Sequence, residues 1–221
     1  MQQLLMVKTL YDLDLNQGIE YLQSQDTRLG TLIAGLEVCS LTHHPPRTTF
    51  LEAIAWGIIG QQINTNTAQM LFQKFLDYAE PKGWTAKTLA NVEPESLRAL
   101  GISRYKARYL KTWAIALQND FPPLSELETW DDLSIIERLT AIKGIGPWTA
   151  QLFLLFRLRR QDILPSQDLG IRIAIQKLYQ LPDCPSPKQV FEYGKNWQPY
   201  RSLASWYLWR SLSATVSQIH L

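Results

Sequence analysis

The sequence of 221 residues has little cysteine, with only Cys39 and Cys184. An iron–sulfur cluster needs four thiolate ligands, and these two cysteines do not form a Cys-x-x-Cys pair. The sequence therefore excludes an iron–sulfur cluster and indicates that both residues are reduced structural thiols.

Histidine is also scarce. The sequence has three, and two of them, His43 and His44, are adjacent. Neither a cysteine nor a carboxylate lies at metal-ligand spacing from this pair, and His220 is far away in the sequence. We therefore interpret the pair as part of a solvated loop. Pro45 and Pro46, which follow it, bar a helix and predict a boundary between elements.

Long hydrophobic runs are absent. A transmembrane helix needs about 20 consecutive apolar residues, and a signal peptide shows a basic segment followed by a shorter apolar one. The sequence has neither pattern, although 46% of its residues are hydrophobic, which is ample for a core. We expect a globular, intracellular protein that does not contact a membrane.

Strand patterns are missing as well, because every periodic segment repeats its apolar residues at helical spacing. Two helices are predicted within residues 14–36, the second of them after Asp26 and Thr27. A further helix is predicted from Phe50 to Ile59, and the next begins at Asn64 or Thr65.

These patterns predict an all-α fold with two helical lobes and an active-site cleft between them. Residues 1–42 and 161–221 are expected to form a terminal helical lobe. Residues 43–160 are expected to form a central lobe.

The net charge of +2 is too small to indicate a nucleic-acid partner, but the basic residues are unevenly distributed. Clusters without acidic residues are typical of a DNA backbone contact, although most such runs are solvated helix faces. The first cluster contains Arg98, Arg104, Lys106, Arg108 and Lys111, and the second contains Arg157, Arg159 and Arg160. We interpret both as DNA-facing because of the motif between and after them.

That motif lies in the stretch 139–172 and begins with a predicted helix, a hairpin and a second helix. The glycines of Gly144-Ile145-Gly146 permit a tight turn and the close approach of a partner, and Pro147 suits the first turn of the next helix. Free N–H groups at a helix start bind phosphate without reading the base sequence. The alternative is an ordinary helical hairpin whose glycines only form the turn. Residues 97–107 repeat the pattern with one residue missing, which suggests a second, degenerate hairpin.

Four stretches in order resemble the helix-hairpin-helix (HhH-GPD) DNA glycosylase superfamily and, within it, the 3-methyladenine DNA glycosylase II branch. They are Ile58-Ile59-Gly60-Gln61-Gln62-Ile63, Gly144-Ile145-Gly146-Pro147-Trp148-Thr149-Ala150, Leu164-Pro165-Ser166-Gln167-Asp168-Leu169-Gly170-Ile171-Arg172, and Trp197-Gln198-Pro199-Tyr200-Arg201-Ser202. The resemblance covers nearly the whole chain from about Phe50 onward. It implies a helix-hairpin-helix glycosylase fold.

The resemblance implies a DNA repair enzyme that flips out alkylated purines, such as 3-methyladenine and 7-methylguanine, and hydrolyses the N-glycosidic bond. The product would be an abasic site in base excision repair, and the partner would be damaged double-stranded DNA bound by a monomer. A non-catalytic DNA-binding module with the same hairpin is the alternative. Asp168 together with Trp148 and Tyr200 favours the enzyme, since a module that only binds DNA needs none of them.

Asp168 is the predicted catalytic residue. A fixed carboxylate stabilises the oxocarbenium character that develops on the sugar and orients or deprotonates the attacking water. The sequence also predicts that Asp168 caps the helix that follows it, and the two roles are compatible.

An extruded base needs a stacking pocket, and by resemblance Trp148 and Tyr200 line it. A cationic alkylated purine is also attracted to an aromatic face. Leu152 stands where a relative has a tyrosine, which predicts a less aromatic cleft.

The resemblance further assigns DNA contacts. Gln62 matches the residue that fills the gap left by the extruded nucleotide, and Gln61 is its neighbour; both are alternatively helix caps. The amides of Gly144, Gly146 and Thr149 would bind phosphate, and Lys143 would face it.

A monovalent cation, Na⁺ or K⁺, is implied at the backbone carbonyls of Thr140, Ile142 and Ile145. No redox cofactor is suggested. Relatives that also cut the backbone use a lysine at the position of Trp148, so we expect no lyase activity.

Overall fold

The computed structural model describes residues 15–42 and 48–212. The predicted loop at His43 and His44, with its two prolines, and His220 lie outside these residues. The described part of the chain is helical and contains no β-strand, which confirms the all-α prediction. Within the same ranges, no helix combines the length and apolar character that crossing a membrane requires.

The chain divides into two compact units, of which one comprises the described residues 48–153 and the other residues 15–42 and 154–212. The second boundary differs from the predicted one, since residues 154–160 belong with the terminal segments. A π-helix at Phe153–Arg157 interrupts the helical spacing there, and the amide of Arg160 donates back to the carbonyl of Leu154 at 2.9 Å. The π-helix directly continues α10, and the chain turns after it, at residues 158–160.

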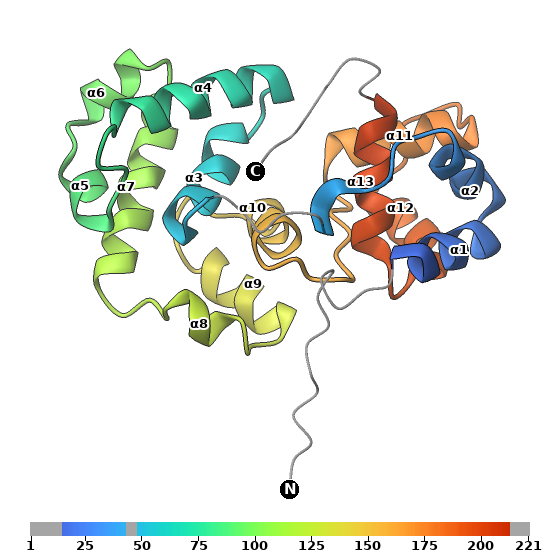
Figure 1. The fold of residues 1–221 in the computed structure, drawn as a ribbon. Coiled ribbons are helices and arrows are strands. Elements are labelled where there is room, and N and C mark those ends of the chain that lie inside the picture. Colours follow the sequence, from blue (N-terminus) through green and yellow to red (C-terminus); the bar gives the residue numbers. More distant parts are fainter. Residues whose placement is uncertain (1–14, 43–47, 213–221) are drawn as a thin grey trace, which may run out of the picture. The chain divides into compact units, whose positions relative to one another are not determined.

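The unit of residues 48–153 contains the helices α3 to α10 (Figure 1). They are α3 Phe50–Gly60, α4 Thr65–Tyr78, α5 Ala86–Asn91, α6 Pro94–Ala99, α7 Arg104–Gln118, α8 Leu124–Leu127, α9 Asp132–Thr140 and α10 Pro147–Leu152. Its core surrounds the fully buried Trp113, whose indole nitrogen donates to the carbonyl of Leu51 at 3.2 Å. Phe50 and Phe121 each pack edge-on against this ring, with centroids at 5.1 Å.

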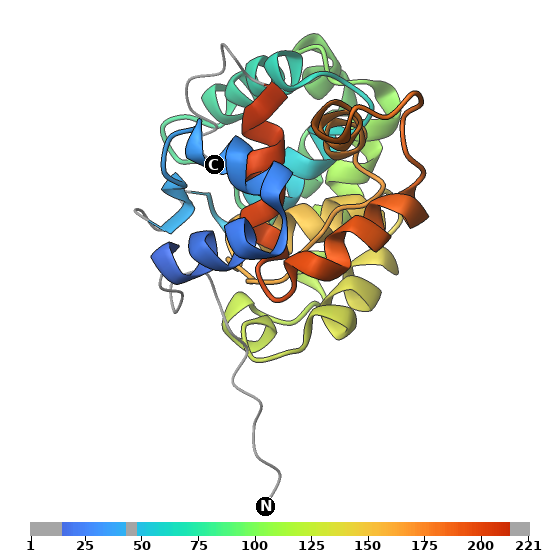
Figure 2. The same ribbon diagram turned by 90° about the vertical axis from the view of Figure 1, so that its right-hand side faces the viewer.

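The other unit joins the two ends of the described chain, and Figure 2 shows the blue α1 and α2 beside the red α13. Its elements are α1 Leu15–Gln25, α2 Thr27–Ala34, the 3₁₀ turns η2 Ser40–Thr42 and η4 Lys195–Trp197, α11 Leu169–Tyr179, α12 Pro187–Gly194 and α13 Arg201–Leu212.

Asp26 connects three elements of this unit. One of its carboxylate oxygens accepts the amide of Leu29 at 3.0 Å, which makes Asp26 the N-cap of α2. The other accepts the indole N–H of the buried Trp197 at 3.0 Å and the hydroxyl of Tyr179. A cap of this kind contributes about 1 kcal/mol, and the two additional partners fix η4 and the end of α11 against it.

Both cysteines are free thiols, and Cys39 is buried while Cys184 is half-buried. Burial raises the pKa of the Cys39 thiol to about 12, against the smaller opposing effects of the Leu41 amide and the Arg159 charge. Cys39 therefore stays protonated at neutral pH, which agrees with a structural thiol.

Candidate functional site

The predicted hairpin is present between α9 and α10, and Gly144 is its turning point. Gly144 has φ +99°, a left-handed conformation that glycine adopts without strain. A Cβ atom at this position would also overlap the ring of Tyr109 on α7. Gly144 is thus required both by the backbone and by the close approach of α7.

Gly146 is different, because its backbone is extended, with φ −97° and ψ 174°, and nothing lies within 4 Å of a Cβ built on it. Pro147 occupies the first turn of α10, as predicted, and Gly146 at the N-cap position has no side chain with which to cap the helix. The space beside Gly146 is therefore open to an approaching group, at a helix end where backbone amides lack intrahelical acceptors.

Helix α3 holds the hairpin from behind. Thr149 is 2% exposed, and its Cγ2 would lie 2.6 Å from a Cβ on Gly57, so only glycine permits this approach. The side-chain amide of Gln61 donates to the carbonyl of Gly144 at 2.9 Å and to the hydroxyl of Thr149 at 3.2 Å. Gln61, which was expected beside DNA, thus binds the hairpin with its amide nitrogen.

Gln62 follows directly and is exposed, with φ +56°. A non-glycine residue in this left-handed region costs roughly 1–2 kcal/mol, and such strain is concentrated at functional positions. The strained backbone projects Gln62 from the joint between α3 and α4. Asn64 then caps α4 through the amide of Thr67 at 2.9 Å, as predicted.

The predicted basic cluster near α7 is partly structural. The ammonium group of Lys106 donates to the carbonyl of Ile59 at 2.8 Å, at the end of α3, and burial lowers its pKa. Lys111 donates in the same way to Val92 at 2.8 Å. Arg104 and Arg108 are exposed and remain candidates for a DNA contact.

The second hairpin was predicted around residues 97–107, and the turn between α6 and α7 has its features. Gly101 has φ +96°, similar to Gly144, and Ser103 caps α7. A Cβ on Gly101 would lie 2.9 Å from a methyl group of Leu71. The two glycine turns therefore share their backbone conformation, and each packs against a neighbouring helix.

The second basic cluster was predicted wrongly as a DNA-facing surface. Arg159 is 4% and Arg160 1% exposed, and Arg157 is half-buried. Arg157 is the last residue of the π-helix, and Arg159 has φ +54°, so Arg159 and Arg160 lie beyond the helix end and not on a helix face. These arginines contribute to the interior and not to an exposed basic face.

Asp168 lies at the N-cap of α11, as predicted from the sequence. Its Oδ1 accepts the amide of Ile171 at 2.8 Å and, in addition, the indole N–H of Trp209 on α13 at 2.9 Å. The ring of Trp209 stacks on Phe156, with centroids 5.5 Å apart and planes at 26°. Sequence reasoning missed Trp209, because it lies 41 residues after Asp168 with no local pattern linking the two.

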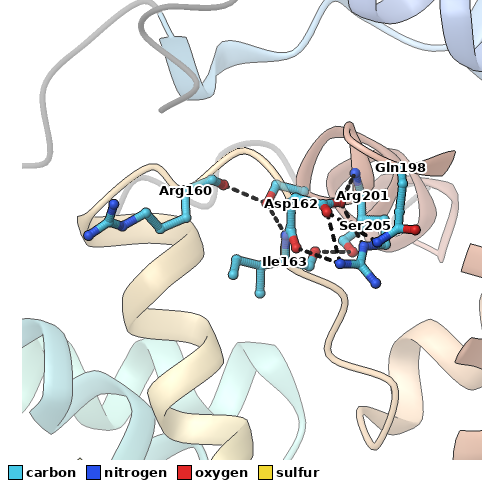
Figure 3. A network of polar contacts seen from close by, with 7 residues as sticks. Arg160, Asp162, Ile163, Gln198, Arg201 and Ser205 are labelled. Carbon is cyan, nitrogen blue, oxygen red and sulfur yellow. Dashed lines mark hydrogen bonds and ion pairs between the residues drawn. The ribbon is translucent and has the colours of Figure 1, made fainter. Parts of the chain in front are cut away.

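Helix α13 is anchored to the segment before Asp168 by the polar network of Figure 3. Arg201 binds Asp162 through two nitrogens, at 2.6 and 2.8 Å. The hydroxyl of Ser202 donates to the carbonyl of Arg160 at 2.6 Å and accepts the amide of Ile163 at 2.9 Å. This network fixes where α13 begins relative to residues 160–163.

The predicted pocket residues are divided between the two units. Trp148 is half-buried, and its ring lies 3.6 Å from a Cβ built on Gly60, while Leu152 on the same helix is buried. Tyr200 is half-buried in the other unit and meets the ring of Tyr21 edge-on at 5.1 Å. A pocket formed by these residues together stays a prediction.

Metal ligation was predicted only through carbonyl groups of the hairpin. The described residues contain no group of three or more His, Cys, Asp or Glu side chains that would hold a metal ion. Of the three predicted carbonyls, that of Ile142 accepts the amide of Ile145 at 3.0 Å. The site at Thr140, Ile142 and Ile145 stays a prediction. Lys143 is exposed in the same turn.

Comparison with known proteins identifies several relatives. Residues 55–199 match the family described as HhH-GPD superfamily base excision DNA repair protein. The chain is 33% identical over 162 residues to DNA-3-methyladenine glycosylase 1 of Schizosaccharomyces pombe, and this match covers 72% of this chain and 71% of that protein. It is 28% identical over 202 residues to the alkylbase DNA glycosidase-like protein mag2 of the same organism, covering 90% and 94%.

A solved structure is similar over most of this chain. It is that of the Schizosaccharomyces pombe 3-methyladenine DNA glycosylase (Mag1) in complex with abasic DNA, which matches with a TM-score of 0.82 and 29% identity. The match covers 91% of this chain and all of that chain, at 100%.

The two hairpin glycines should respond differently to substitution. Gly144→Ala should lower the free energy of unfolding by about 3 kcal/mol, because it strains the backbone and overlaps Tyr109. Gly146→Ala should change it by less than about 0.5 kcal/mol, since its Cβ enters open space. Urea unfolding of both variants measures this, and equal losses would contradict the distinction between a structural and an open glycine.

Proposed function

The chain belongs to the HhH-GPD superfamily of base excision DNA repair proteins, and we propose that it is a DNA glycosylase that removes alkylated purines, of the 3-methyladenine and 7-methylguanine type, from damaged double-stranded DNA. The observation that carries this proposal is Asp168, a carboxylate held by two N–H donors at the start of α11 within the family match. A protein that only binds DNA has no need for a carboxylate fixed in this way.

The hairpin of α9 and α10 binds the DNA backbone. The amides at Gly144, Gly146 and Thr149 donate to a phosphate, which the open space beside Gly146 admits, and Lys143 adds a positive charge. None of these groups reads base identity, so the hairpin binds damaged and undamaged DNA alike. The carbonyls of Thr140, Ile142 and Ile145 are oxygen donors, which suit a bound Na⁺ or K⁺.

The reaction requires an extruded base, because the N-glycosidic bond is inaccessible inside a duplex. Gln62, exposed and strained, fills the gap that the nucleotide leaves. Gln61 supports it by tying the end of α3 to the hairpin. Trp148, Leu152 and Tyr200 line the pocket, where stacking on an aromatic ring contributes roughly 1–3 kcal/mol per base.

Asp168 then promotes the bond cleavage. The bond between C1′ and the base nitrogen breaks with its electron pair leaving on the base, and the ionised carboxylate stabilises the positive charge on the sugar. A water molecule adds to C1′, and its proton passes to Asp168 as general base. The products are a free base and an abasic site in an intact strand. No cofactor is required, and a single copy of the chain suffices.

Release of 3-methyladenine or 7-methylguanine from methylated duplex DNA by the purified protein tests the proposed activity. Asp168→Asn keeps the shape of the side chain and its capping oxygen but removes the negative charge. Single-turnover excision should therefore fall by more than about a hundredfold, while DNA binding is retained. If the variant keeps more than about a tenth of the wild-type rate, Asp168 is not the catalytic carboxylate.

The hairpin assignment is tested by Gly146→Val, because a Cβ at this position enters the space proposed for the phosphate and meets no atom within 4 Å. Affinity should fall about tenfold for damaged and undamaged duplexes alike, as expected on loss of a charge-assisted hydrogen bond. Fluorescence anisotropy with both duplexes measures it. A loss confined to damaged DNA would show that Gly146 contacts the lesion instead.

The enzyme should leave the strand uncut. Relatives that also nick the backbone form a Schiff base with a lysine amine at the position filled here by Trp148, and an indole cannot do this. Lys143 lies five residues earlier, in the turn. Incubation with damaged duplex and borohydride should therefore give no trapped adduct; an efficient adduct that disappears in Lys143→Gln would overturn the water mechanism.

A further inference from the structure

The carboxylate of Asp168 has a second donor that a helix cap does not need. The amide of Ile171 alone, at 2.8 Å from Oδ1, is the ordinary capping bond. The indole N–H of Trp209 reaches the same oxygen at 2.9 Å from a different helix. Two donors from separate elements restrict the carboxylate more than one, because the second prevents the rotation that a single hydrogen bond still allows.

Gly170 makes room for this indole. A Cβ on Gly170 would lie 3.0 Å from Asp168 Oδ1, and 3.2 and 3.4 Å from Cδ1 and Nε1 of Trp209. The glycine lies in the first turn of α11, where its backbone does not need a left-handed conformation. Glycine weakens a helix relative to alanine, so helix formation does not explain it. The close approach of the Trp209 edge to Asp168 explains why a glycine is present here.

The ring of Trp209 is itself held in place. Phe156 stacks on its face with a 5.5 Å centroid distance, which fixes the plane of the indole. The start of α13 is fixed by the Asp162–Arg201 ion pair (Figure 3). The hydroxyl of Ser202 adds to it by accepting the amide of Ile163. The donor is thus presented from a rigid element, and rigidity of the supporting groups is what a precisely aimed reactive group requires.

We propose that Trp209 is a positioning residue that aims the Asp168 carboxylate, and that Gly170 is present to admit it. The proposal deepens the proposed function and rests on it, since it assigns to Trp209 a role in the rate of excision and none in binding the base. Hydrogen bonds to charged groups are strong, and their loss at a reacting group slows the reaction by about ten- to hundredfold.

Two substitutions test this role from opposite sides. Trp209→Phe removes the donor but keeps an aromatic ring against Phe156, and Gly170→Ala keeps the indole but crowds it off Oδ1. Both should lower the single-turnover excision rate by about ten- to hundredfold, with DNA affinity changed less than about twofold. A merely structural role would instead change stability and leave the rate of the folded protein unaltered.

Matched controls exist in the same unit. Trp206→Phe makes the same substitution one turn earlier on α13, at a buried ring, and Gly35→Ala adds a Cβ that meets only ordinary contacts, at 3.7 and 3.8 Å. Neither should alter the excision rate. A wild-type rate in Trp209→Phe or in Gly170→Ala would overturn the proposal, as would an equal loss in Trp206→Phe.

A spectroscopic measurement tests the contact without any activity. The indole ¹⁵N–¹H resonance of Trp209, assigned by its disappearance in Trp209→Phe, should shift in Asp168→Asn and in Gly170→Ala, while that of Trp206 stays in place. An unshifted Trp209 resonance would overturn the hydrogen bond. Wild-type protein that releases no alkylated base overturns the proposed function instead, and the resonance then still decides whether the contact exists.

Discussion

The close approach of α3 to the hairpin is the constraint on which the proposed DNA contact depends. Gly57 lets the methyl group of Thr149 reach the backbone of α3, and Gln61 joins the end of α3 to the carbonyl of Gly144. These contacts fix the turn from one side, while Tyr109 fixes it from the other. The hairpin is therefore a rigid platform, which suits the binding of a phosphate by backbone amides whose direction cannot adapt.

The same contacts connect two sites that lie far apart in the sequence, the joint after α3 and the hairpin. The side chain of Gln61 is used inside the unit, and its neighbour Gln62 is exposed with a strained backbone. The contacts between α3 and α4, which flank this residue, offset the energetic cost of its conformation. Gln62, which is proposed to enter the duplex, is thereby joined through Gln61 to the hairpin proposed to bind the phosphate. This connection fixes the distance between the two sites.

In the other unit, some charged side chains make internal contacts or are buried. Arg201 pairs with Asp162, and Arg159 and Arg160 are nearly inaccessible to solvent. Asp168 makes contacts of another kind, since its Oδ1 accepts the amide of Ile171 and the indole N–H of Trp209. These two N–H groups hold one carboxylate oxygen in place, which suits a group that stabilises a positive charge developing on the sugar.

The sequence by itself determined the helical class, the helix starts near Asp26 and Asn64, the cap at Asp168 and the turn at Gly144, because each depends on spacing and residue type within a few positions. Only the tertiary structure decided that Trp209 meets Asp168, since that contact joins two helices whose relative packing no local pattern encodes. It also reversed the interpretation of the arginines after α10. Their charge is visible in the sequence, but their placement depends on the helix ending at Arg157 and on the left-handed backbone of Arg159, and neither feature has a periodic signal.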